Sequence, residues 1–193
     1  MYTFGSKLSV IQSLQSPRHD YFSFFVCRNP VAKLRSLYRY NKFRSLRAGG
    51  LREIPDFPAH RPPPSWQHFL ELRVSAAANW TDGRRLPRGI EAPLWRLCDL
   101  CHNHWDAVIH METFHSDSRA ILKASGLGHI SLAHMNNHGT KGAKGVSKAM
   151  VRALFRNASR EVIEYVLSVY RNDFLLCGYT ETLNELKKIK RNL

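Results

Sequence analysis

A short apolar run that leads directly into a proline-initiated helix constrains the fold more than any other feature of this sequence. Residues 21–27 are almost entirely apolar and aromatic, which is typical of a buried strand. Pro30 suits the first position of a helix, where its missing N–H costs nothing, and Asn29 before it is a favoured N-cap residue. Apolar side chains then recur at helical spacing. The sequence therefore predicts a buried strand over 21–27 and a helix over 31–43.

The turn between this strand and this helix is a suitable place for a phosphate. Arg28 lies at the turn, and Ser36 lies further along the predicted helix. The free N–H groups of a helix N-terminus attract anions, and a guanidinium can bind an anion through two hydrogen bonds. A strand–helix unit with a solvated basic face is the alternative interpretation, and the local pattern leaves both open.

The same segment resembles a motif of the Golgi carbohydrate sulfotransferases, in particular the chondroitin and dermatan 4-O group. Residues 28–38, Arg-Asn-Pro-x-x-Lys-Leu-x-Ser-x-Tyr, are similar to that family's Arg-Asp-Pro-x-x-Arg-Leu-x-Ser-Ala-Tyr. In the family this segment grips the 3′-phosphate of the sulfate donor, 3′-phosphoadenosine 5′-phosphosulfate (PAPS). The resemblance implies that Arg28 and Ser36 are ligands of the 3′-phosphate. Asn29 replaces the family's Asp and keeps the capping role, whereas Lys33 replaces an Arg and lacks its planar fork.

Two later segments resemble the same family in the same order. Residues 97–117 keep Leu-Cys-x-x-Cys, Trp-Asp-x-Val and Glu-Thr-x-x-x-Asp, and residues 170–179 resemble its terminal Tyr-x-x-Asp-Phe-x-x-Phe-Gly-Tyr. The resemblance implies an α/β fold on a partial P-loop-like sulfotransferase scaffold, with a central parallel sheet flanked by helices. The family's earlier strand and its loop for the 5′-phosphosulfate have no counterpart before Tyr21. We therefore expect a single domain over 1–193 that is incomplete at its N-terminus.

The cysteines allow several interpretations. Cys98-x-x-Cys101-His102 is the pattern of c-type haem attachment, and with His104 it offers four zinc ligands. Four ligands within seven residues make an awkward geometry, so we expect no metal. The chain has four cysteines, which allow three complete pairings that sequence cannot separate. At the end of an apolar strand, Cys27 is most simply interpreted as a buried thiol. The family resemblance implies structural disulfides instead.

The candidate acid–base residues follow the second predicted strand, 106–109. For Glu112 and Asp117 we favour a cap or an ion pair over a catalytic role. Several histidines are candidate bases, and no spacing singles one out, so the catalytic residue stays unassigned: His110, His115, His129, His134 and His138.

Local signals predict the remaining elements. Ser65 and Ser159 are suitable N-caps for two further helices, and residues 181–190 are predicted to form an amphipathic or frayed helix. Proline, glycine and basic residues predict loops over the ranges 44–66, 79–93 and 126–147.

The net charge and the targeting signals limit the partners and the cellular location that can be expected. Lys and Arg total 29 against 15 acidic residues, a formal charge of +14, which predicts an anionic partner. The chain has no apolar run long enough for a membrane anchor and no signal-peptide pattern, which taken alone predicts a cytosolic protein. The family resemblance implies the Golgi lumen or membrane instead. Two N-glycosylation sequons, at Asn79 and Asn157, agree with the Golgi.

The resemblance implies a carbohydrate sulfotransferase homologue that moves a sulfuryl group from PAPS to a sugar hydroxyl of a glycan or glycosaminoglycan. One alternative is an inactive, truncated homologue that binds nucleotide or an anionic glycan. A basic nucleic-acid-binding protein is a second alternative, although the chain carries no helix-turn-helix, zinc-finger or RNA-recognition motif. We therefore expect a nucleotide donor and an anionic glycan as partners, and no nucleic acid.

Overall fold

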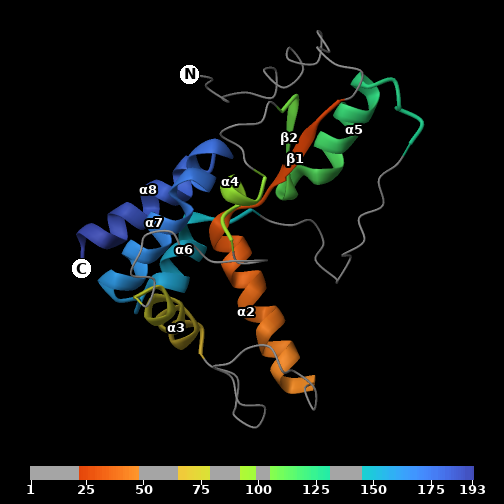
Figure 1. Ribbon diagram of the computed structural model, residues 1–193. Coiled ribbons are helices and arrows are strands. Elements are labelled where there is room, and N and C mark those ends of the chain that lie inside the picture. Colours follow the sequence, from red (N-terminus) through yellow and green to blue (C-terminus); the bar gives the residue numbers. More distant parts are fainter. Residues whose placement is uncertain (1–21, 48–64, 79–91, 99–104, 131–144) are drawn as a thin grey trace. The chain divides into compact units, whose positions relative to one another are not determined.

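The computed structural model describes residues 22–47, 65–78, 92–98, 105–130 and 145–193. In this part of the chain the fold is mixed α/β, mostly helical with one small parallel sheet (Figure 1). The predicted α/β class is confirmed. The chain divides into two compact units, which we describe separately: residues 1–29, 94–145 and 172–180 form the first, and residues 30–93, 146–171 and 181–193 form the second. A single domain over 1–193 stays a prediction.

The first unit is built on two parallel strands. Strand β1 (Phe24–Cys27) pairs with β2 (Ala107–His110), with Phe24 opposite Ala107 and Cys27 opposite His110. Both strands lie where the sequence predicted them, although β1 is shorter than the predicted range 21–27. The backbone N–H and the hydroxyl of Ser23 each donate a 2.8 Å hydrogen bond to Asp106, which joins the starts of the two strands.

Both faces of this sheet carry apolar side chains, as expected for parallel strands. On one face, Phe25 and Val108 pack with the two cysteines Cys27 and Cys177, and the ring of Trp105 meets that of Phe25 edge-on at 5.4 Å. Helix α5 (Phe114–Ala124) covers the other face. Its Ile121 is buried against β2. Most side chains of the sheet therefore belong to the core of this unit.

Short helical elements complete the first unit: α4 (Leu94–Leu97) and the 3-10 helix η2 (Met111–Thr113), which directly follows β2. The last turn of α7 (Arg160–Leu176) and the first residue of α8 (Thr180–Arg191) also belong to this unit.

The second unit is helical. It contains α2 (Pro30–Arg47), α3 (Trp66–Ala78), α6 (Lys148–Phe155) and most of α7 and α8. Tyr38, Trp66, Phe69 and Phe155 form an aromatic cluster, in which the Trp66 ring lies 5.6 Å from Tyr38 and 6.0 Å from Phe155. The indole N–H of Trp66 donates a 2.7 Å hydrogen bond to the Leu154 carbonyl, so this amphipathic side chain is satisfied where it packs.

The two predicted serine caps are confirmed. The Ser65 hydroxyl accepts a hydrogen bond from the His68 N–H at 3.1 Å, and the Ser159 hydroxyl accepts one from the Val162 N–H at 3.4 Å. Ser147 caps α6 in the same way, because its hydroxyl accepts a hydrogen bond from the Met150 N–H at 3.2 Å. The sequence had predicted Ser147 as the last residue of a loop.

The start of the predicted loop 44–66 is wrong, because α2 continues to Arg47. Residues 44–47 are good or neutral helix formers, and the first strong helix breakers are Gly49 and Gly50.

The described helices contain none that is both long and apolar enough to cross a membrane.

Candidate functional site

Three segments of the first unit meet at the carboxyl ends of β1 and β2. Arg28 directly follows β1, and Glu112 follows β2 in the 3-10 helix. Because Cys27 is paired with His110, the two strands end at the same level. Arg28 and Glu112 therefore follow the strands at the same end of the sheet. Ligands of open α/β sheets bind outside the carboxyl ends of the strands. Tyr179, from the turn between α7 and α8, completes this cluster.

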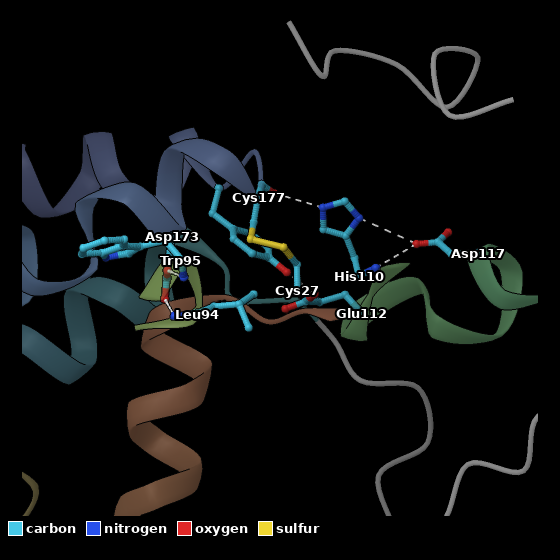
Figure 2. The surroundings of a disulfide bond; sticks show 9 residues. Cys27, Leu94, Trp95, His110, Glu112, Asp117, Asp173 and Cys177 are labelled. Carbon is cyan, nitrogen blue, oxygen red and sulfur yellow. Dashed lines mark hydrogen bonds and ion pairs between the residues drawn. A yellow bond between two sulfur atoms is a disulfide. The ribbon is translucent and has the colours of Figure 1, made fainter. Parts of the chain in front are cut away.

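A disulfide bond attaches the third segment to the sheet. Cys27 at the end of β1 is bonded to Cys177 at the end of α7, 150 residues away in sequence, with 5.9 Å between their Cα atoms (Figure 2). The interpretation of Cys27 as a buried thiol is therefore wrong: the side chain is buried, but as half of a disulfide. Its apolar strand predicted the burial, whereas the partner depends on the path of the whole chain.

The turn that carries Tyr179 has a defined backbone. Gly178 has a φ of +72°, a left-handed conformation that suits glycine. The Gly178 N–H donates to the Leu175 carbonyl at 3.3 Å, and the Tyr179 N–H donates to the Phe174 carbonyl at 2.8 Å. These two bonds form a Schellman motif, which ends α7 and satisfies its last carbonyls. The position of the Tyr179 backbone is thus set by both the motif and the nearby disulfide.

Tyr179 and Glu112 form a hydrogen-bonded pair. The phenol donates to Glu112 Oε2 at 2.8 Å. Burial raises the pKa of Tyr179, and the negative charge of Glu112 raises it further. The phenol therefore stays protonated and acts as a hydrogen-bond donor, not as a base. No other hydrogen bond to the Glu112 carboxylate is found in the described part of the chain.

Arg28 completes the cluster as an exposed cation. Its guanidinium has no hydrogen-bond partner among the described residues. Crowding by neighbouring atoms lowers the pKa of Arg28, and the negative charge of Glu112 partly opposes that effect. An arginine keeps its charge under such shifts, so the site presents a permanent cation to solvent.

His110 and Asp117 lie beside the cluster but are engaged with each other and with the backbone. His110 Nε2 donates to the Cys177 carbonyl at 3.0 Å, and Nδ1 lies 3.7 Å from Asp117 Oδ2 (Figure 2). Asp117 also accepts hydrogen bonds from the His110 N–H at 3.1 Å and from the Thr113 hydroxyl at 2.5 Å. Asp117 is therefore engaged by its own segment, and the expectation that it has no catalytic role stays a prediction. His110 could act as a base through Nε2 only after losing its bond to the Cys177 carbonyl.

Asp173 has a structural role that the sequence did not reveal. It is buried, and its two carboxylate oxygens accept hydrogen bonds from the backbone N–H groups of Leu94 at 2.7 Å and Trp95 at 2.8 Å (Figure 2). The carboxylate thereby caps α4 and attaches it to α7. The only signal for this role in the sequence is the terminal motif that contains Asp173.

The two predicted phosphate ligands are placed in different units. Arg28 lies in the cluster, whereas Ser36 is half-buried on α2, in the second unit. That both contact one phosphate stays a prediction. Lys33, which stands where the resembled motif has an arginine, donates to the Ala92 carbonyl and lies 6.0 Å from the centre of the Tyr170 ring.

The predicted metal ligands cannot be assessed as a set. Cys101, His102 and His104 lie outside the described residues, as do His134 and His138. Within the described ranges, no three His, Cys, Asp or Glu side chains are grouped as a metal site would require. The expectation of no metal stays a prediction.

The chain is similar to known sulfotransferases. It is 24% identical over 196 residues to carbohydrate sulfotransferase 10 of Xenopus laevis, and the match covers 88% of this chain and 50% of that protein. The chain thus spans about half the length of the curated relative that it matches. No solved structure shows significant similarity. Residues 5–180, most of the chain, match the sulfotransferase family, and the protein therefore belongs to that family.

Proposed function

We propose that this chain acts in the transfer of a sulfuryl group from PAPS to a sugar hydroxyl of a glycan or glycosaminoglycan, in the manner of the chondroitin and dermatan 4-O-sulfotransferases. The observation that carries the proposal is the exposed Arg28 guanidinium at the carboxyl ends of two parallel strands, where no described residue accepts a hydrogen bond from it. A guanidinium in that position is suited to a phosphate. The sulfotransferase family match supports the donor class, and the carbohydrate sulfotransferase supports the acceptor class.

In this proposal, Arg28 and Ser36 hold the 3′-phosphate of the donor. Arg28 can supply two parallel N–H donors and a positive charge, and the Ser36 hydroxyl can supply one more hydrogen bond. Arg28 also stands two residues before Pro30, at which α2 begins. The N-terminus of an 18-residue helix adds partial positive charge near this point of the chain.

The reaction itself is a displacement at sulfur. The acceptor hydroxyl attacks the sulfur, the bond from sulfur to the 5′-phosphate oxygen breaks, and a base takes the hydroxyl proton. Catalysis of such a transfer depends mainly on positioning and on stabilisation of charge on the leaving phosphate. In PAPS the 3′-phosphate and the transferring group lie on different arms of the ribose. Residues at the 3′-phosphate therefore bind and orient the donor, and the catalytic base stays unassigned.

An anionic acceptor in the Golgi is consistent with the charge and the covalent structure of the chain. The formal charge of +14 favours association with sulfated or carboxylated sugars. The Cys27–Cys177 disulfide is typical of proteins that fold in an oxidising compartment. Both observations support the proposal of a Golgi protein that acts on an anionic glycan.

The test is a calorimetric titration of the purified chain with 3′-phosphoadenosine 5′-phosphate (PAP), the product that keeps the 3′-phosphate. We expect saturable binding that Arg28→Ala removes and that Arg39→Ala, an exposed arginine on α2, leaves unchanged. A folded chain that does not bind PAP would contradict the proposal. Incubation with labelled PAPS and desulfated chondroitin or dermatan then measures transfer. Binding without transfer would indicate the inactive homologue, and salt-dependent binding to any duplex would indicate the nucleic-acid alternative.

A further inference from the structure

We propose that Glu112 and Tyr179 are positioning residues for Arg28, so that the preference for a 3′-phosphorylated nucleotide is set by three residues from three separate segments. This inference rests on the proposed function, because it assumes that Arg28 binds the 3′-phosphate.

The strand register places the carboxylate beside the guanidinium. Cys27 and His110 are partners in the parallel pair, and Arg28 and Glu112 leave the sheet one and two residues later. The two side chains are close enough for the charge of Glu112 to act on Arg28, yet no direct ion pair joins them in the described structure. The negative charge of Glu112 thus attracts the guanidinium, while no described residue takes up its N–H donors.

Tyr179 competes with Arg28 for the same carboxylate. Its phenol donates to Glu112 Oε2 and so takes up one of the carboxylate's acceptor positions. An arginine that faces a free carboxylate can form two parallel hydrogen bonds with it and would then offer less to a ligand. With one acceptor position of Glu112 taken by the phenol, the parallel two-bond arrangement is less favoured, and Arg28 keeps more of its N–H donors for a phosphate.

The backbone around Tyr179 keeps the phenol in its position beside the Glu112 carboxylate. The Schellman motif at Gly178 sets the entry of the chain, and the disulfide joins Cys177 to the residue that precedes Arg28. The Tyr179 ring also meets the His110 ring edge-on, with 5.6 Å between ring centres. Three independent restraints therefore set the position from which the phenol reaches Glu112.

Two nucleotides that differ only at the 3′-position provide the test. PAP and adenosine 5′-phosphate share the base, the ribose and the 5′-phosphate, so the ratio of their dissociation constants isolates the contribution of the 3′-phosphate. The wild-type chain is expected to prefer PAP, and Arg28→Ala is expected to remove the preference. Glu112→Gln and Tyr179→Phe should each reduce the ratio about tenfold and leave the affinity for adenosine 5′-phosphate unchanged. A purely structural role would weaken both nucleotides together.

Additivity provides a second readout. If Glu112 acts through Arg28, the double variant Arg28→Ala/Glu112→Gln should have the same ratio as Arg28→Ala alone. Glu181→Gln, on an exposed position of α8, is the matched control and should behave as wild type. Glu112→Asp, which shortens the side chain but keeps its charge, serves as a further variant if Glu112→Gln does not fold.

The outcomes separate this inference from the proposed function. A wild-type chain without preference for PAP would overturn both. A preference that Arg28→Ala removes, but that Glu112→Gln and Tyr179→Phe keep in full, would overturn the positioning role alone and leave the 3′-phosphate site in place.

Discussion

Cys27 and Cys177 are covalently joined although 150 positions separate them in the sequence, and the bond lies directly beside Arg28 and Tyr179. The same bond therefore closes a long loop of the chain and joins two of the three segments of the candidate site. Its removal is expected to affect stability and the site together.

Replacing both cysteines by alanine is expected to lower the free energy of unfolding by about 2–5 kcal/mol, because the crosslink no longer restricts the unfolded chain. Urea denaturation with and without reductant measures this. The wild-type midpoint should fall in reductant, and that of Cys27→Ala/Cys177→Ala should not move. Cys98→Ser is the control and should stay sensitive to reductant. A wild-type chain that is indifferent to reductant would contradict the prediction.

Asp173→Ala is expected to destabilise the fold by about 2–4 kcal/mol, because two part-buried backbone N–H groups at the start of α4 lose a charged acceptor. Asp173→Asn keeps one acceptor oxygen and should cost less. Chemical denaturation measures both variants, with Asn172→Ala at the exposed neighbouring position as control. Equal effects of the Ala and Asn variants would show that the cap is not the cause.

The pair of Glu185 and Arg152 predicts a dependence of stability on pH. Arg152 Nε lies 2.6 Å from Glu185 Oε1, and this hydrogen bond lowers the pKa of Glu185 below its ordinary value of 4.5. The Glu185 side chain is only 4% exposed, while Arg152 itself is 64% exposed. A carboxyl with a lowered pKa stabilises the fold above its unfolded pKa, and this contribution is lost as the pH falls through the folded pKa.

Thermal unfolding between pH 7 and about pH 3 tests this dependence. The wild type should lose more stability on acidification than Glu185→Gln, which has no carboxyl at this position to titrate. Glu181→Gln, whose pair with Lys148 is exposed and 3.9 Å long, should keep the wild-type profile. Parallel profiles for wild type and Glu185→Gln would contradict the prediction.

The Golgi proposal predicts an N-linked glycan on Asn157. This residue is exposed in the turn between α6 and α7, and Ser159 completes its sequon while capping α7. After expression through the secretory pathway, peptide mass spectrometry should find the glycan on Asn157, and Asn157→Gln should lack it. Ser159→Ala should lose the glycan and about 1 kcal/mol of stability, whereas Ser159→Thr should keep both. An unmodified Asn157 in secreted protein would contradict the prediction.

Local signals in the sequence predicted much of the secondary structure. The apolar run that ends at Cys27, the proline at the start of α2, and the serines at positions 65 and 159 each act on backbone within a few residues. Burial of the strands and capping of the helices depend on such neighbours, and they were predicted correctly. The same signals placed Arg28 at the carboxyl end of a buried strand. The end of α2 was wrong because a loop was expected before the glycines that break the helix.

The tertiary structure alone decided which distant residues meet. Nothing near Cys27 indicates that it pairs with Cys177, that Tyr179 donates to Glu112, or that Asp173 caps a helix almost 80 positions earlier in the chain. Each of these contacts depends on how the strands register and on where α7 ends, and both result from packing over the whole unit. The sequence by itself determined the two strands, the start of α2 and the cation at the strand end. The path of the chain decided the carboxylate, the phenol and the disulfide that surround it.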